Sequence, residues 1–387
     1  MFYLSQLYKK DGQFWYDNHI DREIIDNEQG NMMKILFGIQ GTGNGHISRC
    51  RTLAKALDEA GAQVDYIFSG RDAKDYFGMD AFGNYKIYEG MSFATKNGKI
   101  NLRKTIQRIR GFRLIKDVRD LNLSQYDTII SDFEPVSAWA AHHQGRESLG
   151  ISNQAVCQYF KPKEYGFVAN TIMKFYAPVT KPVGLHWFHF GHALVPPMID
   201  PLVCQQENGK IIVYLPFESL EDIINLLIPF SHDYEFECFH PQIKQETINN
   251  NVHLKPLSRD EFTNAVSCCS GIITNTGFAL ISEALVLGKK ILTKPVSGQF
   301  EQIYNADCLA KLDLATVMDF LDQKTVQTWL TKPSPSPVIY PDVATQLANW
   351  IVSNQQESLS SLSNRLWQQT VFPANVQQRI KALGYAI

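Results

Sequence analysis

The sequence predicts an α/β protein built of two doubly wound domains in tandem. Short apolar runs of strand length alternate with amphipathic stretches, the alternation fades in an aromatic-rich middle near 150–200, and it then restarts. A chain of 387 residues is also too long for one ordinary core and right for two. Two such domains usually bind ligand in the cleft between them, at the carboxyl ends of the strands.

The first alternating region follows residues 1–32, which are rich in charge and which we interpret as an extension. Its first strand is KILFGI, and a helix follows over about 46–60 with Gly61 as its closing residue. Further strands are QVDYIFS, NYKIYEG and YDTIISD, the last of which ends in Asp132. We place this first domain at 33–200.

After the proline-containing linker PPMIDPLVCQQENGK the alternation restarts, and we place a second domain at 201–340. Its expected strands are KIIVYLPF, YEFECFH, NVHLKPL, GIITN and KKILTKP. Its expected helices lie near 219–228, 259–267, 278–287 and 299–310. The remaining segment, 341–387, has the pattern of helices.

Composition excludes several classes of protein. The net charge is −2, so the chain is not a globally basic nucleic-acid binder, and we expect no nucleic-acid partner. Its apolar runs are far shorter than the ~20 residues of a membrane span. The 7 cysteines are odd in number and form no C-x-x-C pair, so we expect neither disulfides nor a metal site. With no apolar signal segment either, we expect a cytoplasmic protein.

A glycine-rich loop, GTGNGH, joins the first strand to its helix. Gly41, Gly43 and Gly45 would let the backbone approach a ligand closely. The spacing fits neither the dinucleotide fingerprint, because His46 stands where its third glycine would be, nor the P-loop. His46 begins the helix on the side of the predicted cleft. It would act there as a base near neutral pH, or it would only cap the helix.

A second polar set lies in NTGFALISEALVLGKKILTKPVSGQFEQIYNA. A helix start there favours a diphosphate through free N–H groups and the helix dipole. The residues at that start are Asn275, Thr276, Gly277 and Phe278. Glu283 follows within the helix, where its carboxylate could accept two ribose hydroxyls. Three more side chains could bind sugar hydroxyls: Gln299, Glu301 and Gln302. The alternative is a strand–helix unit with ordinary polar caps.

This second stretch resembles the donor-binding region of GT-B glycosyltransferases, whose two domains are Rossmann-like. It is most similar to the branch of the N-acetylglucosaminyltransferase that makes lipid II (family 28-like). The matching residues are Glu283, Gly288, Pro295, Gln302, Asn305 and Ala306. The loop GTGNGH is similar to the N-terminal Gly-rich loop of the family, and IISDFEP to its strand-end aspartate. The loop is one residue longer here, and ISRC replaces the usual proline-containing continuation.

The resemblance implies an inverting hexosyltransferase that uses a nucleotide-sugar donor, UDP-linked, without a metal or other cofactor. The acceptor would be a hydroxyl, on a lipid-linked molecule or a cell-envelope glycan precursor. Glu283 would hold the ribose, and Thr276 and Gly277 would face the diphosphate. Glu301 and Gln302 would bind sugar hydroxyls. His46 would lie near the acceptor hydroxyl, and Asp132 would orient His46 or bind acceptor. Weaker candidates are Ser219 for the phosphate side and Leu257 for the base.

A basic amphipathic stretch, KINLRKTIQRIRGFRLIKDVRDL, occupies 99–121 in the first domain. Its residues 99–119 favour peripheral contact with an anionic membrane, at the inner face of which the enzyme would work. Equally, it could be a helix packed on the sheet with a solvated basic face, and Gly111 would interrupt such a helix.

Two other functions stay open. One is an enzyme like UDP-N-acetylglucosamine 2-epimerase, although the Arg-rich first loop of those enzymes is absent here. The other is a non-catalytic nucleotide-sugar binding protein, which the pairing of His46 with Glu283 disfavours because a pure binder needs no base.

Overall fold

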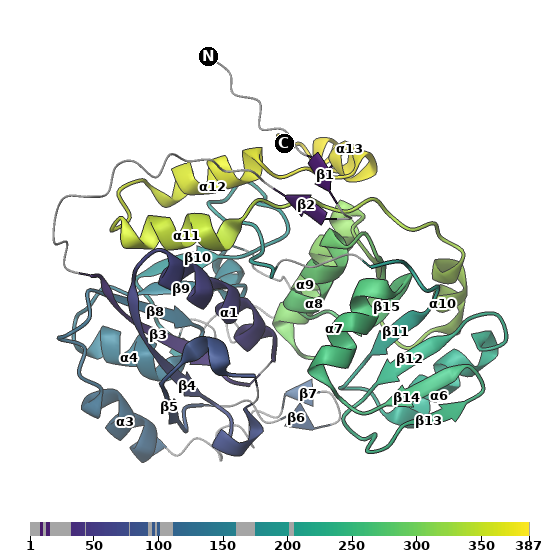
Figure 1. Cartoon of the computed structure of the whole chain (residues 1–387), viewed down its shortest axis with the longest axis horizontal. Coiled ribbons are helices and arrows are strands. Elements are labelled where there is room, and N and C mark those ends of the chain that lie inside the picture. The colour runs from purple at the N-terminus through teal and green to yellow at the C-terminus, as the bar shows by residue number, and fades with distance from the viewer. Residues whose placement is uncertain are drawn as a thin grey trace. The chain divides into compact units, whose positions relative to one another are not determined.

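The structure, a computed structural model, describes residues 8–10, 13–15, 32–42, 44–76, 78–91, 95–96, 99–100, 111–159, 175–200 and 205–386. The chain divides into two units, Met1–Met32 and Met33–Ile387. In the first unit, strands β1 (Tyr8–Lys10) and β2 (Gln13–Trp15) form an antiparallel pair. The second unit contains two large sheets with helices (Figure 1), which confirms the predicted α/β class with two parallel-sheet domains. The boundaries that we place near 200 and 340 stay predictions.

The first large sheet has the strand order β10-β9-β8-β3-β4-β5, and its pairs are parallel. Its strands are β3 (Lys34–Gln40), β4 (Gln63–Ser69), β5 (Tyr85–Tyr88), β8 (Thr128–Asp132), β9 (Leu149–Ser152) and β10 (Lys181–Gly184). The strand order reverses between β3 and β8, which are neighbours in the sheet. Open parallel sheets bind ligands at such a reversal, outside the carboxyl ends of the strands. Gln40 and Asp132 are the residues that end these two strands.

The second large sheet has the order β13-β14-β12-β11-β15-β16-β17, with β13 antiparallel to β14 and the other pairs parallel. Its strands are β11 (Ile211–Tyr214), β12 (Phe236–Phe239), β13 (Thr247–Asn249), β14 (Val252–Lys255), β15 (Gly271–Asn275), β16 (Lys290–Lys294) and β17 (Thr316–Val317). Here the order reverses between β11 and β15. In open parallel sheets, ligands bind outside the carboxyl ends of the strands at such a reversal.

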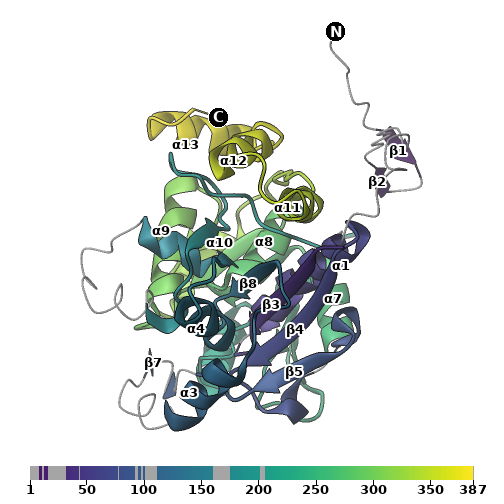
Figure 2. The ribbon, with the colours of Figure 1, turned by 90° about the vertical axis from the view of Figure 1, so that its left-hand side faces the viewer.

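The helices of the second unit cover both sheets. Their bounds are α1 (Asn44–Glu59), α3 (Gly111–Asp120), α4 (Pro135–His143), α6 (Leu220–Leu227), α7 (Arg259–Cys268), α8 (Phe278–Val286), α9 (Phe300–Leu312), α10 (Gln323–Leu330), α11 (Val343–Val352), α12 (Leu359–Gln368) and α13 (Ala374–Ala382). Gly61 follows α1 with φ 78°, a backbone conformation that suits glycine after a helix. The C-terminal helix α11 packs against α1, and α11, α12 and α13 gather at one end in both views (Figures 1 and 2).

The aromatic segment GLHWFHFG, residues 184–191, is part of the core. Trp187 and Phe188 are buried, and the indole Nε1 of Trp187 donates a hydrogen bond of 2.9 Å to Ser282 Oγ on α8. Burial of aromatic side chains of this size dominates the energetics of a core. The segment after β10 therefore ties α8 to the first large sheet.

Some elements differ from the prediction. We did not expect β9, β10, β13, β17, α4 or α10. The strand β9 is short and contains glycine, and β10 contains Pro182, which an edge strand tolerates because one side of it needs no ladder bond.

Within the basic stretch, Lys99–Ile100 is not helical but forms strand β7, antiparallel to β6 (Thr95–Lys96). The helix α3 begins at Gly111, and residues 101–110 lie outside the described part. In the part of the chain that the structure describes, no helix is long and apolar enough to cross a membrane.

Candidate active site

His46 and Asp132 lie together at the reversal of strand order in the first large sheet. His46 is in the first turn of α1, which follows β3, and Asp132 ends the neighbouring strand β8. His46 Nδ1 is 3.1 Å from Asp132 Oδ2, and Asp132 is fully buried while His46 is 13% exposed. Parallel pairing of β3 with β8 explains why residues 86 positions apart meet.

Arg49, one turn after His46, forms an ion pair with Asp132 through both carboxylate oxygens. Its Nε donates to Asp132 Oδ2 at 3.1 Å and its Nη2 to Oδ1 at 2.5 Å, and the Cys50 thiol donates to Oδ2 at 3.0 Å. Burial alone would raise the pKa of Asp132, but Arg49 and His46 outweigh it and hold the pKa well below its usual range. Burial and the nearby carboxylate raise the pKa of Cys50, so Cys50 is a thiol that donates. Asp132 is therefore an ionised carboxylate.

Gln154 connects this group to the second large sheet. It begins the short helix η3 (Gln154–Gln158), and its Oε1 accepts from Arg49 Nη2 at 3.3 Å. Its Nε2 donates to Glu301 Oε2 on α9 at 2.8 Å and lies 3.4 Å from His46 Nε2. A single amide therefore stands between His46 and Glu301, which come from the two halves of the unit.

The glycine loop after β3 has little room for side chains. A Cβ on Gly41 would lie 2.0 Å from Tyr76 Oη, and the Gly41 N–H donates to the Ser69 carbonyl at 2.7 Å. A Cβ on Gly45 would lie 3.3 Å from Ala279 Cβ on α8. Gly43 lies outside the described residues.

At the start of α8, two of the predicted donor residues hold the loop in shape. Thr276 is fully buried, and its Oγ1 is 2.9 Å from Thr293 Oγ1. Gln302 Oε1 accepts from the backbone N–H groups of Thr276 at 3.1 Å and of Val296 at 3.0 Å. These contacts use the Thr276 hydroxyl and the Gln302 carbonyl within the protein. The sugar and diphosphate roles that we predict for these two residues stay predictions.

The other residues at this helix start differ in what they offer a ligand. Asn275 Nδ2 donates to the Lys294 carbonyl at 3.0 Å, and Phe278 is buried against Trp187 with ring centroids 4.9 Å apart. Gly277 is the N-cap of α8, and a Cβ built on it would meet nothing within 4 Å. The open space beside Gly277 is where a ligand phosphate could reach the helix N-terminus.

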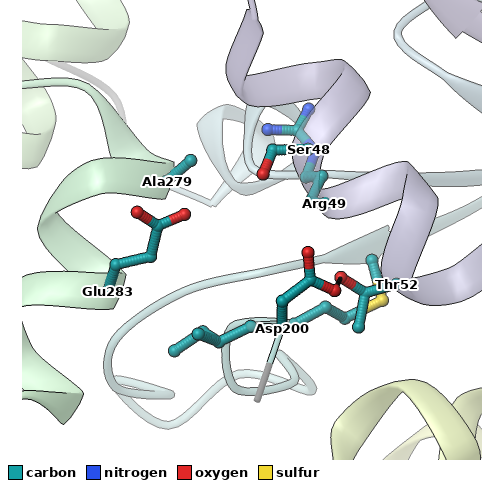
Figure 3. Close-up of a pocket in the computed structure, with 8 residues that line it drawn as sticks. Ser48, Arg49, Thr52, Asp200, Ala279 and Glu283 are labelled. Carbon is teal, nitrogen blue, oxygen red and sulfur yellow. Dashed lines mark hydrogen bonds between the residues drawn. The ribbon is translucent and has the colours of Figure 1, made fainter. Parts of the chain in front are cut away.

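Glu283 faces a pocket between α8 and α1. The lining residues are Ser48, Arg49, Thr52, Met198, Ile199, Asp200, Ala279 and Glu283, and Figure 3 shows the Glu283 and Asp200 carboxylates facing into it. Thr52 Oγ1 donates to Asp200 Oδ1 at 2.5 Å. Burial and the charge of Asp200, partly opposed by Arg259, raise the pKa of Glu283 to about 7. The pocket therefore offers two carboxylates and two hydroxyls, groups that suit a diol.

The remaining predicted residues lie in loops that follow strands of the second sheet: Ser219 after β11, Leu257 after β14 and Gln299 after β16. Ser219 Oγ accepts from the Asp222 N–H at 3.1 Å and donates to Asp222 Oδ2 at 2.6 Å, so it caps α6. Gln299 is half-buried before α9 and Leu257 is 49% exposed. Beside them, Lys294 pairs with Glu218 at 2.7 Å.

Our prediction missed Arg49 and Gln154. Arg49 had a usable signal, because residues three apart on a helix share a face and His46 already marks that face. Gln154 had no such signal in the sequence, since its partners His46 and Glu301 are 108 and 147 positions away in the chain.

The family of the chain follows from comparison with known proteins. A family model described as glycosyl transferase family 1 matches residues 33–333. The chain therefore belongs to glycosyl transferase family 1, and it is a glycosyltransferase. A comparison with curated protein sequences finds no match.

Solved structures share the fold. The glycotransferase of kitacinnamycin has a TM-score of 0.56 and 11% identity, covering 88% of this chain and 100% of that chain. LpCGTa, solved in complex with UDP, has a TM-score of 0.55 and 12% identity, covering 88% and 99%. The glycosyltransferase SnogD from Streptomyces nogalater has a TM-score of 0.50 and 14% identity, covering 92% and 99%. The chain thus has the GT-B glycosyltransferase fold.

Proposed function

We propose that the protein is an inverting glycosyltransferase that uses a nucleotide-sugar donor and a hydroxyl acceptor. The observation that carries this proposal is the approach of His46 Nε2 and Glu301 Oε2 to one amide, at 3.4 and 2.8 Å. His46 belongs to the helix after β3, and Glu301 belongs to the region with donor-site motifs. A base and a carboxylate that can bind sugar hydroxyls therefore face the same point, where acceptor and sugar would meet.

The chemistry follows from this placement. The acceptor hydroxyl gives its proton to His46 Nε2 while its oxygen bonds to the anomeric carbon, opposite the leaving group. The bond between that carbon and the diphosphate oxygen breaks, and its electron pair stays on the nucleoside diphosphate. The N-terminus of α8 beside Gly277 stabilises the departing charge, so the reaction needs no metal.

For the donor we propose a UDP-sugar. LpCGTa, which shares the fold, was solved in complex with UDP. The pocket that contains Glu283 and Asp200 supports this proposal, because carboxylates accept hydrogen bonds from the two hydroxyls of a ribose.

For the acceptor we propose a lipid-linked precursor of a cell-envelope glycan, in keeping with the lipid II branch that the motifs resemble. Helix α3 supports this proposal, since Arg113, Lys116 and Arg119 are exposed on it and Ile115 is 50% exposed among them. Such a face suits an anionic membrane surface. Co-sedimentation should detect binding to vesicles with anionic lipid and none to neutral vesicles. Lys116→Glu with Arg119→Glu should abolish it, and binding unchanged by these substitutions would exclude α3 as the contact.

The first experiment is a calorimetric and thermal-shift screen with UDP, GDP, dTDP and CMP, and then with UDP-sugars. We expect micromolar binding of UDP that Glu283→Ala removes. A 100-fold excess over the Kd adds ~2.7 kcal/mol to the free energy of unfolding, which a thermal shift detects readily. If no nucleotide binds, the donor-site proposal is wrong.

Activity then separates the alternatives. With donor and acceptor, His46→Asn should lower kcat by about 10²–10⁴-fold, and the matched control His232→Asn, at an exposed histidine, should not. Conversion of the UDP-sugar in the absence of any acceptor would indicate an epimerase-like enzyme instead. Donor binding without any turnover would indicate a binding protein.

A further inference from the structure

We propose that Lys294 binds the diphosphate of the nucleotide-sugar donor, and that the Glu218 carboxylate occupies Lys294 until the donor displaces it. This proposal rests on the proposed transferase function and deepens it, because it names a cation for the leaving group. Lys294 Nζ donates to Glu218 Oε1 at 2.7 Å. The side chains of Lys294 and Glu218 are 11% and 18% exposed, so an anion from solution can reach the pair.

The ion pair lies at the reversal of strand order in the second large sheet. Lys294 is the last residue of β16, and Glu218 lies in the loop after β11. Because β15 lies between these two strands, the Lys294 side chain passes the carboxyl end of β15 to reach Glu218. That end continues from Asn275 into the loop before α8. Ligands of open parallel sheets bind at such a reversal, so the ammonium lies where we expect the donor.

The two helices that follow the strands of this reversal differ in what their N-termini offer an anion. On α6, Ser219 caps the N-terminus, and Glu221 and Asp222 add negative charge to the first turn. On α8, no side chain of the described residues caps the N-terminus, the first turn holds no acidic residue, and a Cβ on Gly277 would meet nothing within 4 Å. A diphosphate at this reversal is therefore repelled by α6 and attracted by α8, and Lys294 adds a full positive charge.

The Glu218 side chain can leave Lys294 without loss of the loop that carries it. The Glu218 N–H donates to the Leu215 carbonyl at 3.1 Å, and the Glu218 carbonyl lies 3.2 Å from Nε2 of the buried His240. These backbone contacts do not involve the carboxylate. An ammonium is a compact cation that pairs with a carboxylate or with a phosphate, so the diphosphate competes with Glu218 for the same charge. After transfer, the return of Glu218 to Lys294 favours release of the nucleoside diphosphate.

The experiment measures the binding of UDP and of inorganic pyrophosphate by calorimetry. Lys294→Met should weaken the binding of both about 10–100-fold, because it removes a charge-assisted hydrogen bond to a phosphate. Glu218→Gln should tighten the binding of UDP roughly 3–10-fold, because the competing carboxylate is gone. In the double variant this gain should vanish, since the carboxylate acts only through Lys294. Glu221→Gln removes an exposed carboxylate from the first turn of α6, and as the matched control it should change the affinity for UDP less than about twofold.

The proposal is overturned if Lys294→Met binds UDP as the original protein does, or if the gain of Glu218→Gln persists in the double variant. If Lys294→Met does not fold, Glu218→Gln decides, and an unchanged affinity for UDP contradicts us. Failure of the transferase proposal gives a different result. A protein that transfers no sugar, but whose binding of UDP or pyrophosphate depends on Lys294 and Glu218 as described, refutes the transferase and supports the exchange. A protein that binds neither UDP nor pyrophosphate refutes both.

Discussion

Replacement of Asp132 by asparagine measures how much the buried ion pair with Arg49 stabilises the fold. Asp132 is fully buried, and the Arg49 side chain is only 5% exposed, so solvent screens the pair little. Both carboxylate oxygens accept hydrogen bonds from donors on α1. An asparagine NH₂ group at either oxygen would meet at least one N–H donor and leave it unpaired. Because the guanidinium would also lose its counter-ion, we expect a loss of about 3–5 kcal/mol.

The assay is urea denaturation at pH 7 of the original protein, of Asp132→Asn, of Arg49→Met and of the double variant. Asp58→Asn, an exposed aspartate on α1, is the matched control and should change the free energy of unfolding by less than about 0.5 kcal/mol. The double variant should be more stable than the sum of the single losses predicts, with a coupling energy of about 2–3 kcal/mol. Additive losses would refute the argument that the two charges depend on each other.

The way in which the free energy of unfolding changes with pH tests the direction of the pKa shift of Asp132. Since the pKa of Asp132 is lower in the folded protein than in the unfolded chain, where it is about 3.9, the unfolded chain takes up the proton first as the pH falls. The stability that Asp132 contributes is therefore fully present above pH ~4 to 5 and declines below it. The difference between the original protein and Asp132→Asn should shrink over that acidic range. A constant difference would contradict the lowered pKa.

Three further predictions concern single positions. Because the pKa of Glu283 is about 7, affinity for a nucleotide held through its carboxylate should rise about tenfold from pH 6 to pH 8, and calorimetry of Glu283→Gln should show no such rise. Gly38→Ala would place a Cβ 2.0 Å from Ser137 Oγ and should cost about 1–3 kcal/mol by urea denaturation. Ser219→Ala should lose about 1 kcal/mol in the same assay, because the Asp222 N–H loses its cap. An affinity that does not change between pH 6 and pH 8 would contradict the first prediction. A free energy of unfolding equal to that of the original protein would contradict either of the other two.

The sequence predicts the fold well where strands are fully buried and helices carry an apolar face. The strands β3, β8, β11 and β15 are buried at almost every position and contain short apolar runs, because both faces of a parallel sheet are covered. The edge strands β10 and β17 and the short strand β9 lack such runs. Their pairing depends on neighbours that are distant in the chain, which no local pattern records.

The residues of the candidate site likewise fall into two groups, those that the sequence predicts and those that it does not. Glycine loops and strand ends mark where the backbone can approach a ligand, so His46 and Asp132 are predictable from their positions. Side-chain partners are chosen by packing instead, and that is why Gln154, which joins His46 to Glu301, carries no signal.

Packing also explains why a motif residue need not meet the ligand that its motif suggests. Gln302 matches the donor-site pattern, yet its carbonyl oxygen binds two backbone N–H groups that shape the loop before α8. Glu301, its neighbour, instead directs a carboxylate toward the centre of the site through Gln154. Adjacent residues on a helix point about 100° apart, so one of such a pair can build the loop while the other faces the ligand. In the donor site that we propose, one short motif would therefore both shape the loop before α8 and supply a side chain for the ligand.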